Sequence, residues 1–194
     1  MIYLALLRGV NVGGNNKIDM RQLTSAFHEA GLRDILTYLN SGNVIFSSAL
    51  DESAVKTICE SAIAKNFGLS IAVAILTSHE LADALANAPD WWGSAPGVKH
   101  NAIFVISPAK AQDVCAEVGE IKPAYERCAC HGKLIFWSAP VETFSKTRWA
   151  SVSKRATYQK ITIRNANTAF KLADLIRKIT PAPAQGGAPP PSPR

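Results

Sequence analysis

The sequence predicts an α+β fold built from two ferredoxin-like lobes, each with the element order β-α-β-β-α-β and an antiparallel sheet. Short apolar runs alternate with amphipathic helical stretches in that order over residues 1–76. The same order of patterns recurs over residues 101–179, although the residues themselves do not repeat. With 194 residues, of which 47% are hydrophobic and 19% charged, the chain is long enough to bury a substantial core.

The first lobe, residues 1–76, is defined by clear helix and turn signals. Asp19 followed by Gln22 is a capping-box pattern that opens a helix at Met20, and Gly31 is the expected stop signal. Strands are expected at residues 2–7, 35–39, 44–47 and 70–76, and a second helix at residues 53–66. The middle strands are joined by turn-forming residues, which predicts an antiparallel hairpin.

Residues 77–100 are predicted to link the lobes. Thr77 and Glu80 form a second capping-box pattern and open a linking helix. The loop over residues 90–97 contains the pair Trp91-Trp92, which we expect to fill the seam between the lobes.

The second lobe, residues 101–179, repeats the element order and adds a helix. Its strands are expected at residues 101–106, 125–130, 133–138 and 160–163. Ser107-Pro108 has the residue types of an N-cap and a first helical position. Short and terminal helices are expected at residues 142–149 and 165–178. Residues 180–194 are rich in proline, glycine and alanine, which predicts a flexible tail.

Composition favours a cytoplasmic protein. No apolar run reaches the roughly 18 residues that a membrane span requires, and the sequence from Met1 lacks the pattern of a secretory signal, so no membrane association is expected. The four cysteines are too sparse for a disulfide scaffold. Cys128-Ala-Cys130-His131 resembles half of a zinc site, but the sequence offers no second pair of ligands at suitable spacing, so no metal site is predicted.

Positive charge is concentrated near the C-terminus. Residues 1–145 contain 11 Lys and Arg against 14 Asp and Glu, whereas residues 146–194 contain 10 Lys and Arg and a single acidic residue, Asp174. This basic segment is interleaved with Trp149 and Tyr158, a mixture that suits single-stranded nucleic acid. A solvated basic face explains the same charge, and the predicted strands lack the aromatic signature of RNA-binding sheets.

The loop between the first strand and the first helix is the strongest candidate site. Its candidate ligand-binding residues are Arg8, Asn11, Gly13, Gly14, Asn15 and Lys17. Glycines allow a ligand to approach the backbone, and the polar side chains donate hydrogen bonds to anions. The spacing matches neither the dinucleotide-binding nor the P-loop pattern. A structural loop, in which the glycines only make tight turns, is an equal alternative.

The hairpin turn is the second candidate. Asn40, Ser41 and Asn43 are turn-forming residues, and that structural role is the simpler interpretation. If the turn lies beside the Arg8–Lys17 loop, the same side chains would add donors and acceptors to one pocket.

Three segments closely resemble the bacterial family called domain of unknown function 1697. They are LRGVNVGGNNKI at residues 7–18, TYLNSGNVIF at residues 37–46 and ITIRNANTAFKL at residues 161–172. The resemblance runs from Met1 to about Ile179 and implies a cytosolic bacterial protein with an α+β fold. It supplies no substrate, reaction or cofactor. It does add polar signature residues to the candidate site, namely Arg164, Asn165, Asn167, Thr168 and Lys171.

These observations lead to one main hypothesis and two alternatives. We expect a groove between the lobes to bind a phosphate-bearing ligand, which is either a small metabolite or a nucleic-acid backbone. An enzyme using the same groove is an alternative, with Arg8 and Lys17 stabilising negative charge and Asp19 as the nearest carboxylate. The other alternative is a protein-interaction scaffold that uses the Trp91-Trp92 loop. The sequence predicts neither the cofactor nor the oligomeric state.

Overall fold

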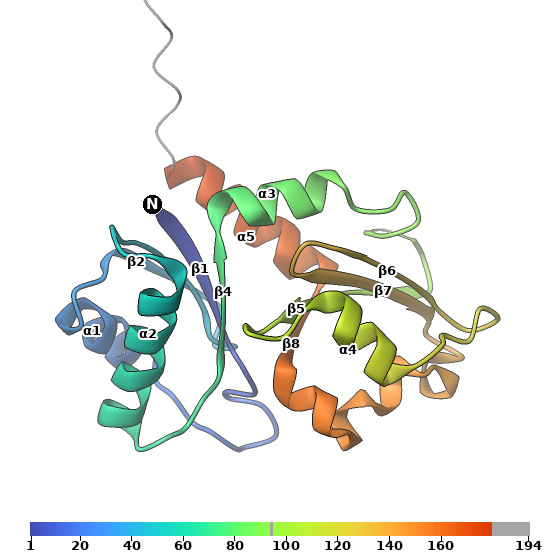
Figure 1. The fold of residues 1–194 in the computed structure, drawn as a ribbon, viewed down its shortest axis with the longest axis horizontal. Coiled ribbons are helices and arrows are strands. Elements are labelled where there is room, and N and C mark those ends of the chain that lie inside the picture. Colours follow the sequence, from blue (N-terminus) through green and yellow to red (C-terminus); the bar gives the residue numbers. More distant parts are fainter. Residues whose placement is uncertain (94, 180–194) are drawn as a thin grey trace, which may run out of the picture.

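The structure, a computed structural model, describes residues 1–93 and 95–179, so the predicted tail at residues 180–194 lies outside the described residues. In this part of the chain, two four-stranded antiparallel sheets have matching strand orders, β2-β3-β1-β4 and β6-β7-β5-β8 (Figure 1). This arrangement confirms the predicted α+β fold with two β-α-β-β-α-β-like units. Among the described residues, no helix is both long enough and apolar enough to cross a membrane.

The elements follow the predicted order. The first unit contains β1 (Ile2–Leu7), α1 (Met20–Glu29), β2 (Arg33–Tyr38), β3 (Asn43–Ser47), α2 (Glu52–Phe67) and β4 (Val73–Thr77). Helix α3 (Ser78–Ala86) leads to the second unit, which contains β5 (Val98–Val105), α4 (Ala111–Val118), β6 (Arg127–His131), β7 (Leu134–Pro140), β8 (Ile161–Asn165) and the terminal helix α5 (Ala166–Ile179).

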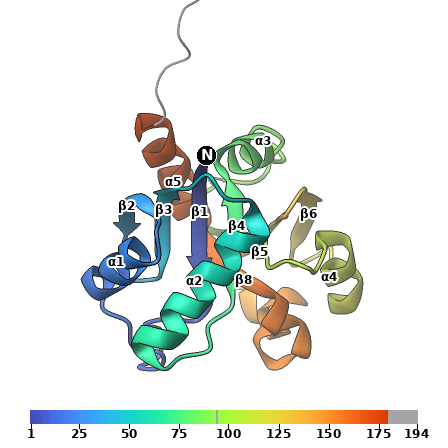
Figure 2. The same cartoon turned by 60° about the vertical axis from the view of Figure 1, so that its left-hand side comes forward.

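Both sheets bury side chains on both faces. Along β1, Tyr3, Ala5 and Leu7 pack with α1 and α2, which lie together on one side of the sheet (Figure 2). The alternate residues Leu4 and Leu6 belong to a second core shared with β5, β7, α3 and α5. The region between the sheets is therefore a packed apolar core, and a groove between the lobes can only lie at its rim.

Trp92 belongs to this shared core, as the sequence predicted. Its ring meets Phe136 edge-on with centroids 4.9 Å apart, and its indole N–H donates to the carbonyl of Asn101 at 2.9 Å. Because Trp92 is buried, it is not available for the predicted alternative of a protein-binding loop.

Two helix predictions in the second unit were wrong. Ser107-Pro108 does not start α4, which begins at Ala111, and the Ser107 hydroxyl instead donates to Glu52. The predicted helix at residues 142–149 is replaced by three 3₁₀ segments, Phe144–Lys146, Trp149–Lys154 and Ala156–Lys160. The backbone amides of Arg148 and Trp149 donate to the buried carboxylate of Glu126, so they are not available to a regular helix.

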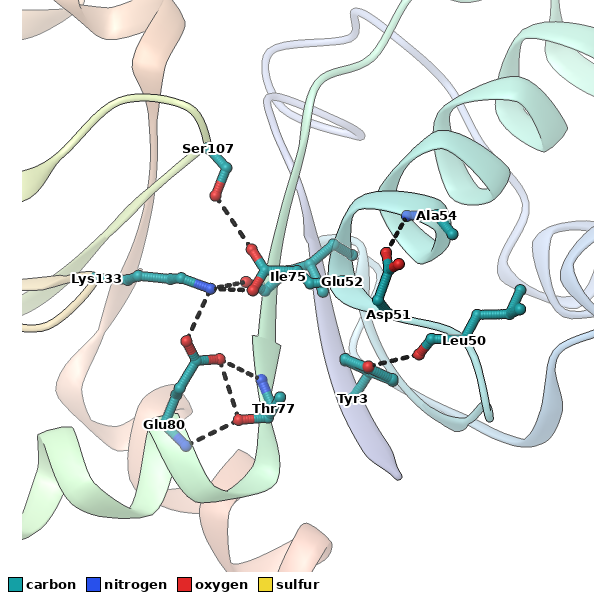
Figure 3. A network of polar contacts seen from close by, with 10 residues as sticks. All are labelled: Tyr3, Leu50, Asp51, Glu52, Ala54, Ile75, Thr77, Glu80, Ser107 and Lys133. Carbon is teal, nitrogen blue, oxygen red and sulfur yellow. Dashed lines mark hydrogen bonds and ion pairs between the residues drawn. The ribbon is translucent and has the colours of Figure 1, made fainter.

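Lys133, in the turn between β6 and β7, links the two units (Figure 3). Its Nζ forms ion pairs with Glu52 at the start of α2 and with Glu80 of α3, the latter at 2.9 Å, and donates to the carbonyl of Ile75. The Ser107 hydroxyl donates to the other oxygen of Glu52 at 3.1 Å. A single ammonium group from the second unit thus joins three elements that lie outside its own sheet.

We expect Lys133→Met to lower the free energy of unfolding by about 1–2 kcal/mol, since the pairs are only half-buried but form a network. Although burial raises the pKa of Glu80, bonds from Thr77 and Lys133 hold it below the ordinary value of 4.5. The carboxylate's contribution is therefore present above about pH 4.5 and is lost as the pH falls through the lowered pKa. Urea titrations of wild type and variant at pH 7 and at acid pH should show the difference shrinking in acid. The matched variant Lys154→Met, at an exposed lysine, should change stability by under about 0.5 kcal/mol. An equal loss of stability in both variants would refute the stabilising role of the Lys133 ion pairs.

Candidate functional site

Arg164 of β8 brings two of the predicted segments together with the end of β1. Its Nε donates to Asn43 Oδ1 at 2.5 Å, and its Nη2 donates to the carbonyls of Leu7 and Ser41 at 3.0 and 2.8 Å. Its Nη1 donates to Oγ1 of Thr162 and to the carbonyl of residue 163 within its own strand. Burial lowers the pKa of the guanidinium to about 10, so it remains charged at neutral pH.

This arrangement is a joint between the lobes. The five N–H groups of the Arg164 guanidinium all donate to protein oxygens, which leaves none for a ligand. Asn43 is fully buried, and its Nδ2 donates to the carbonyl of Tyr38 and to the Ser41 hydroxyl. Gly42 has φ +71°, and an added Cβ would lie 2.7 Å from Cβ of Leu7. The predicted segments therefore converge, but Ser41, Asn43 and Arg164 are used in holding the chain together.

Two asparagine side chains bond the Arg8–Lys17 loop to itself and to the hairpin turn. Asn11 Nδ2 donates to the carbonyls of Ile18 and Asn40 at 2.8 and 2.7 Å, and Asn11 Oδ1 accepts from the amide of Ile18 at 2.9 Å. Asn16 Nδ2 donates to the carbonyl of Gly9 at 3.1 Å. Both asparagines have positive φ, a conformation that asparagine tolerates better than most residues. The loop is thus closed near its base and bonded to the hairpin turn, which is the proximity that a shared pocket requires.

The remaining predicted groups of this loop face solvent. Gly13, Gly14, Asn15 and Lys17 are exposed, and in the described part of the chain no hydrogen bond or ion pair engages the side chains of Asn15 and Lys17. Arg8 is partly buried, with Cζ 5.9 Å from the centroid of the Tyr158 ring, and its Nε has no partner among the described residues. Because Asn16 bonds Gly9, the two cationic residues flank the closed base of the loop.

The predicted site residues at the start of α5 do not lie beside the Arg8–Lys17 loop. Asn165 Oδ1 caps α5 by accepting from the amide of Thr168 at 2.7 Å, and Asn167 is exposed at the first turn. Lys171 lies 3.7 Å from Asp174, a carboxylate shared with Lys178. In Figure 1, α5 packs beside α3, whereas the segment that follows β1 lies near the bottom of the view. The helix and the loop therefore do not form the single lined groove that we predicted.

The basic segment near the C-terminus is largely occupied by internal contacts. Arg155 donates to the carbonyl of Val118 at 2.7 Å, Lys160 forms an ion pair with Glu117, and Arg148 Nε donates to the carbonyl of Glu120. Trp149 is only 1% exposed, so it cannot stack on a base. In residues 1–93 and 95–179, no three His, Cys, Asp or Glu side chains are arranged to hold a metal ion.

Comparison with known proteins identifies the family. Residues 1–136 match the family model described as protein of unknown function (DUF1697). The chain belongs to the DUF1697 family. The matched range includes the first two motifs recognised in the sequence, whereas the third, at residues 161–172, lies beyond it. No curated protein matches the chain.

A solved structure supports this assignment over a longer range. This DUF1697 protein is similar to the conserved bacterial protein SP0830 from Streptococcus pneumoniae, with 29% sequence identity and a TM-score of 0.81. The match covers 90% of this chain and 98% of the streptococcal one. The similarity therefore extends to nearly the whole streptococcal chain, although it identifies no ligand.

Sequence reasoning missed three polar residues that are buried or line a pocket in this DUF1697 fold. Glu126 is 2% exposed and accepts from four N–H groups, and His100 and Asn101 line a pocket at the start of α5. The available signal was the polar run Lys99-His100-Asn101 directly before an apolar strand. We assigned Lys99 and His100 to the end of the linker and Asn101 to the start of a strand, whereas all three residues belong to β5.

Proposed function

We propose that this protein binds a small phosphate-bearing molecule at the rim of the lobe junction, through Arg8, Lys17 and the exposed backbone of Gly13 and Gly14. The observation that carries this proposal is Arg8, whose Cζ lies over the Tyr158 ring and whose guanidinium forms no hydrogen bond or ion pair with the described residues. An unpaired, partly buried guanidinium is costly unless an anion completes its hydrogen bonds. The asparagine-locked loop beside it lowers the entropy lost on binding.

A small molecule is favoured over a nucleic-acid backbone. Extended phosphate backbones are bound by several free cations and by exposed aromatic rings. Here Arg148, Arg155 and Lys160 are engaged within the protein, and Trp149 is buried. The free cationic groups near the loop, Arg8 and Lys17, suit a single phosphate group better than a nucleic-acid strand.

The enzyme alternative has no comparable support. Asp19, the nearest carboxylate, uses Oδ1 to cap α1 by accepting from the amides of Arg21 and Gln22 at 2.9 and 3.0 Å. This carboxylate oxygen is therefore already engaged in the helix cap.

Titration of the ¹⁵N-labelled protein with glucose 6-phosphate and adenosine monophosphate at low ionic strength tests the proposal. The Arg8 Nε–Hε signal should shift saturably, because an anion bound at the guanidinium changes its surroundings. Arg8→Met and Lys17→Met should each weaken binding by about 10-fold to 100-fold, the value of a charge-assisted hydrogen bond. Arg21→Met, at an exposed arginine on α1, is the matched control and should bind like wild type.

The proposal fails if the Arg8 signal does not move with either phosphate monoester, or if Arg8→Met and Arg21→Met bind equally well. A 20-residue single-stranded RNA included in the same series decides the competing ligand class. Tighter binding of the RNA, with an affinity that falls steeply with salt, would replace the small-molecule proposal by the nucleic-acid one.

A further inference from the structure

Three cysteines of the second unit lie together between α4 and β6, the edge strand of its sheet. Cys128 and Cys130 are two positions apart on β6, so their side chains point to the same face of the sheet. In the register with β7 they lie opposite Trp137 and Ile135, which belong to the core beneath α4. Cys115 of α4 packs against that core, as does Cys128. The cluster shares no residue with the proposed phosphate site.

The cysteines differ in their access to solvent. Cys130 is exposed and Cys115 and Cys128 are half-buried, whereas Cys59 is fully buried in the core of the first unit. All four are free thiols. A small oxidant in solution can therefore reach the cluster on α4 and β6 far more easily than it can reach Cys59.

Within the cluster, Cys115 carries the most reactive thiol. A hydrogen bond from the Cys128 thiol, aided by one from Cys130, lowers the pKa of Cys115 below its ordinary value of 9.0, although burial opposes the change. The bond with Cys115 and burial raise the pKa of Cys128, and burial together with the charge of Cys115 raises the pKa of Cys130. Cys115 is therefore the first of the three to ionise, and the thiolate is the form that attacks an oxidant.

We infer that Cys115 is a site of reversible oxidation by peroxides, with Cys128 as the thiol that forms a disulfide with it. The Cys115 thiolate attacks one oxygen of hydrogen peroxide, the O–O bond breaks and hydroxide leaves, so that Cys115 becomes a sulfenic acid. Cys128 Sγ then attacks Cys115 Sγ, the S–O bond breaks, and the departing hydroxide takes the proton of the Cys128 thiol and leaves as water. The two sulfurs together lose two electrons, which reduce the peroxide. Cys128 is assigned because it packs on the same core as Cys115, whereas Cys130 is exposed.

Peptide mapping of the reduced full-length protein after exposure to hydrogen peroxide tests this inference. Remaining thiols are blocked with N-ethylmaleimide, and trypsin is applied without reductant. Because Lys122 precedes a proline, trypsin should release residues 111–127 as one peptide and residues 128–133 as the next. We expect a disulfide that joins these two peptides and that dithiothreitol reverses. Cys59 is the internal control: burial raises its pKa to about 12, so it should be oxidised at least about 10-fold more slowly than Cys115.

Cys130→Ser is the matched variant, because it removes the exposed thiol of the cluster and should retain the cross-link. The inference is overturned if peroxide forms no cross-link, or if it joins Cys128 to Cys130 within the shorter peptide. Loss of the cross-link in Cys130→Ser would also overturn it. So would oxidation of Cys59 as fast as that of Cys115, or cross-linked peptides that come only from a covalent dimer on a non-reducing gel.

Discussion

Replacement of Arg164 by methionine is expected to lower the free energy of unfolding by about 3–5 kcal/mol. Methionine keeps the length of the side chain but removes five hydrogen bonds. The buried Oδ1 of Asn43 and the carbonyls of Leu7 and Ser41 then lose a charged donor. Because these acceptors belong to the first unit and Arg164 to the second, we also expect the variant to weaken the junction between the lobes.

Urea denaturation followed by circular dichroism measures this loss. Arg177→Met is the matched control on α5, since its side chain is 78% exposed and it forms only a surface pair with Asp174. The control should change stability by under about 0.5 kcal/mol. Arg164→Lys should recover part of the loss, because lysine keeps the charge but cannot reproduce the planar fork of donors. A loss below about 1 kcal/mol for Arg164→Met would mean that the joint contributes little.

The second large effect is expected at Glu126, where glutamine should cost about 2–4 kcal/mol in spite of its almost identical shape. One carboxylate oxygen accepts from the amides of Lys122 and Arg148 at 3.1 and 2.6 Å. The other accepts from the Trp137 indole and the Trp149 amide at 3.1 and 3.3 Å. Glutamine removes the negative charge and places an NH₂ group against two of these donors.

Denaturation of Glu126→Gln followed by tryptophan fluorescence tests this, because Trp137 and Trp149 both contact the carboxylate. Glu120→Gln, at an exposed glutamate nearby, should remain within about 0.5 kcal/mol of wild type. If the two variants are equally stable, the four donors are satisfied in another way and the role given to Glu126 is wrong.

The accuracy of the sequence predictions depended on the range of the interactions involved. The Asp19 cap and the Thr77–Glu80 capping box were predictable because each forms between residues three positions apart. The two antiparallel sheets followed from the repeated β-α-β-β-α-β pattern. The helix predicted at residues 142–149 failed because Glu126, some 20 residues earlier, binds two of its amides, and no local pattern contains that information.

The candidate site shows the same limit. The polar residues of the three signature segments were predicted to share one site, and Arg164 does meet Ser41 and Asn43. The sequence could not reveal that this meeting consumes every donor of the guanidinium, since a polar residue in a joint and one in a binding site have the same composition. Among the residues predicted in the Arg8 loop, Arg8 and Lys17 keep cationic groups without an anionic partner in the described structure.

By itself, the sequence determined the two-lobed α+β fold, the family and the segments that lie at the lobe junction. Apolar periodicity, caps and turns act over a few residues, so they can be read directly from the chain. The tertiary structure alone decided which polar groups are satisfied and which are not. That outcome depends on side chains far apart in sequence, as when Arg164 donates to Leu7, Ser41 and Asn43 of the first unit, while His100 Nε2 and Asn101 Nδ2 have no partner among the described residues.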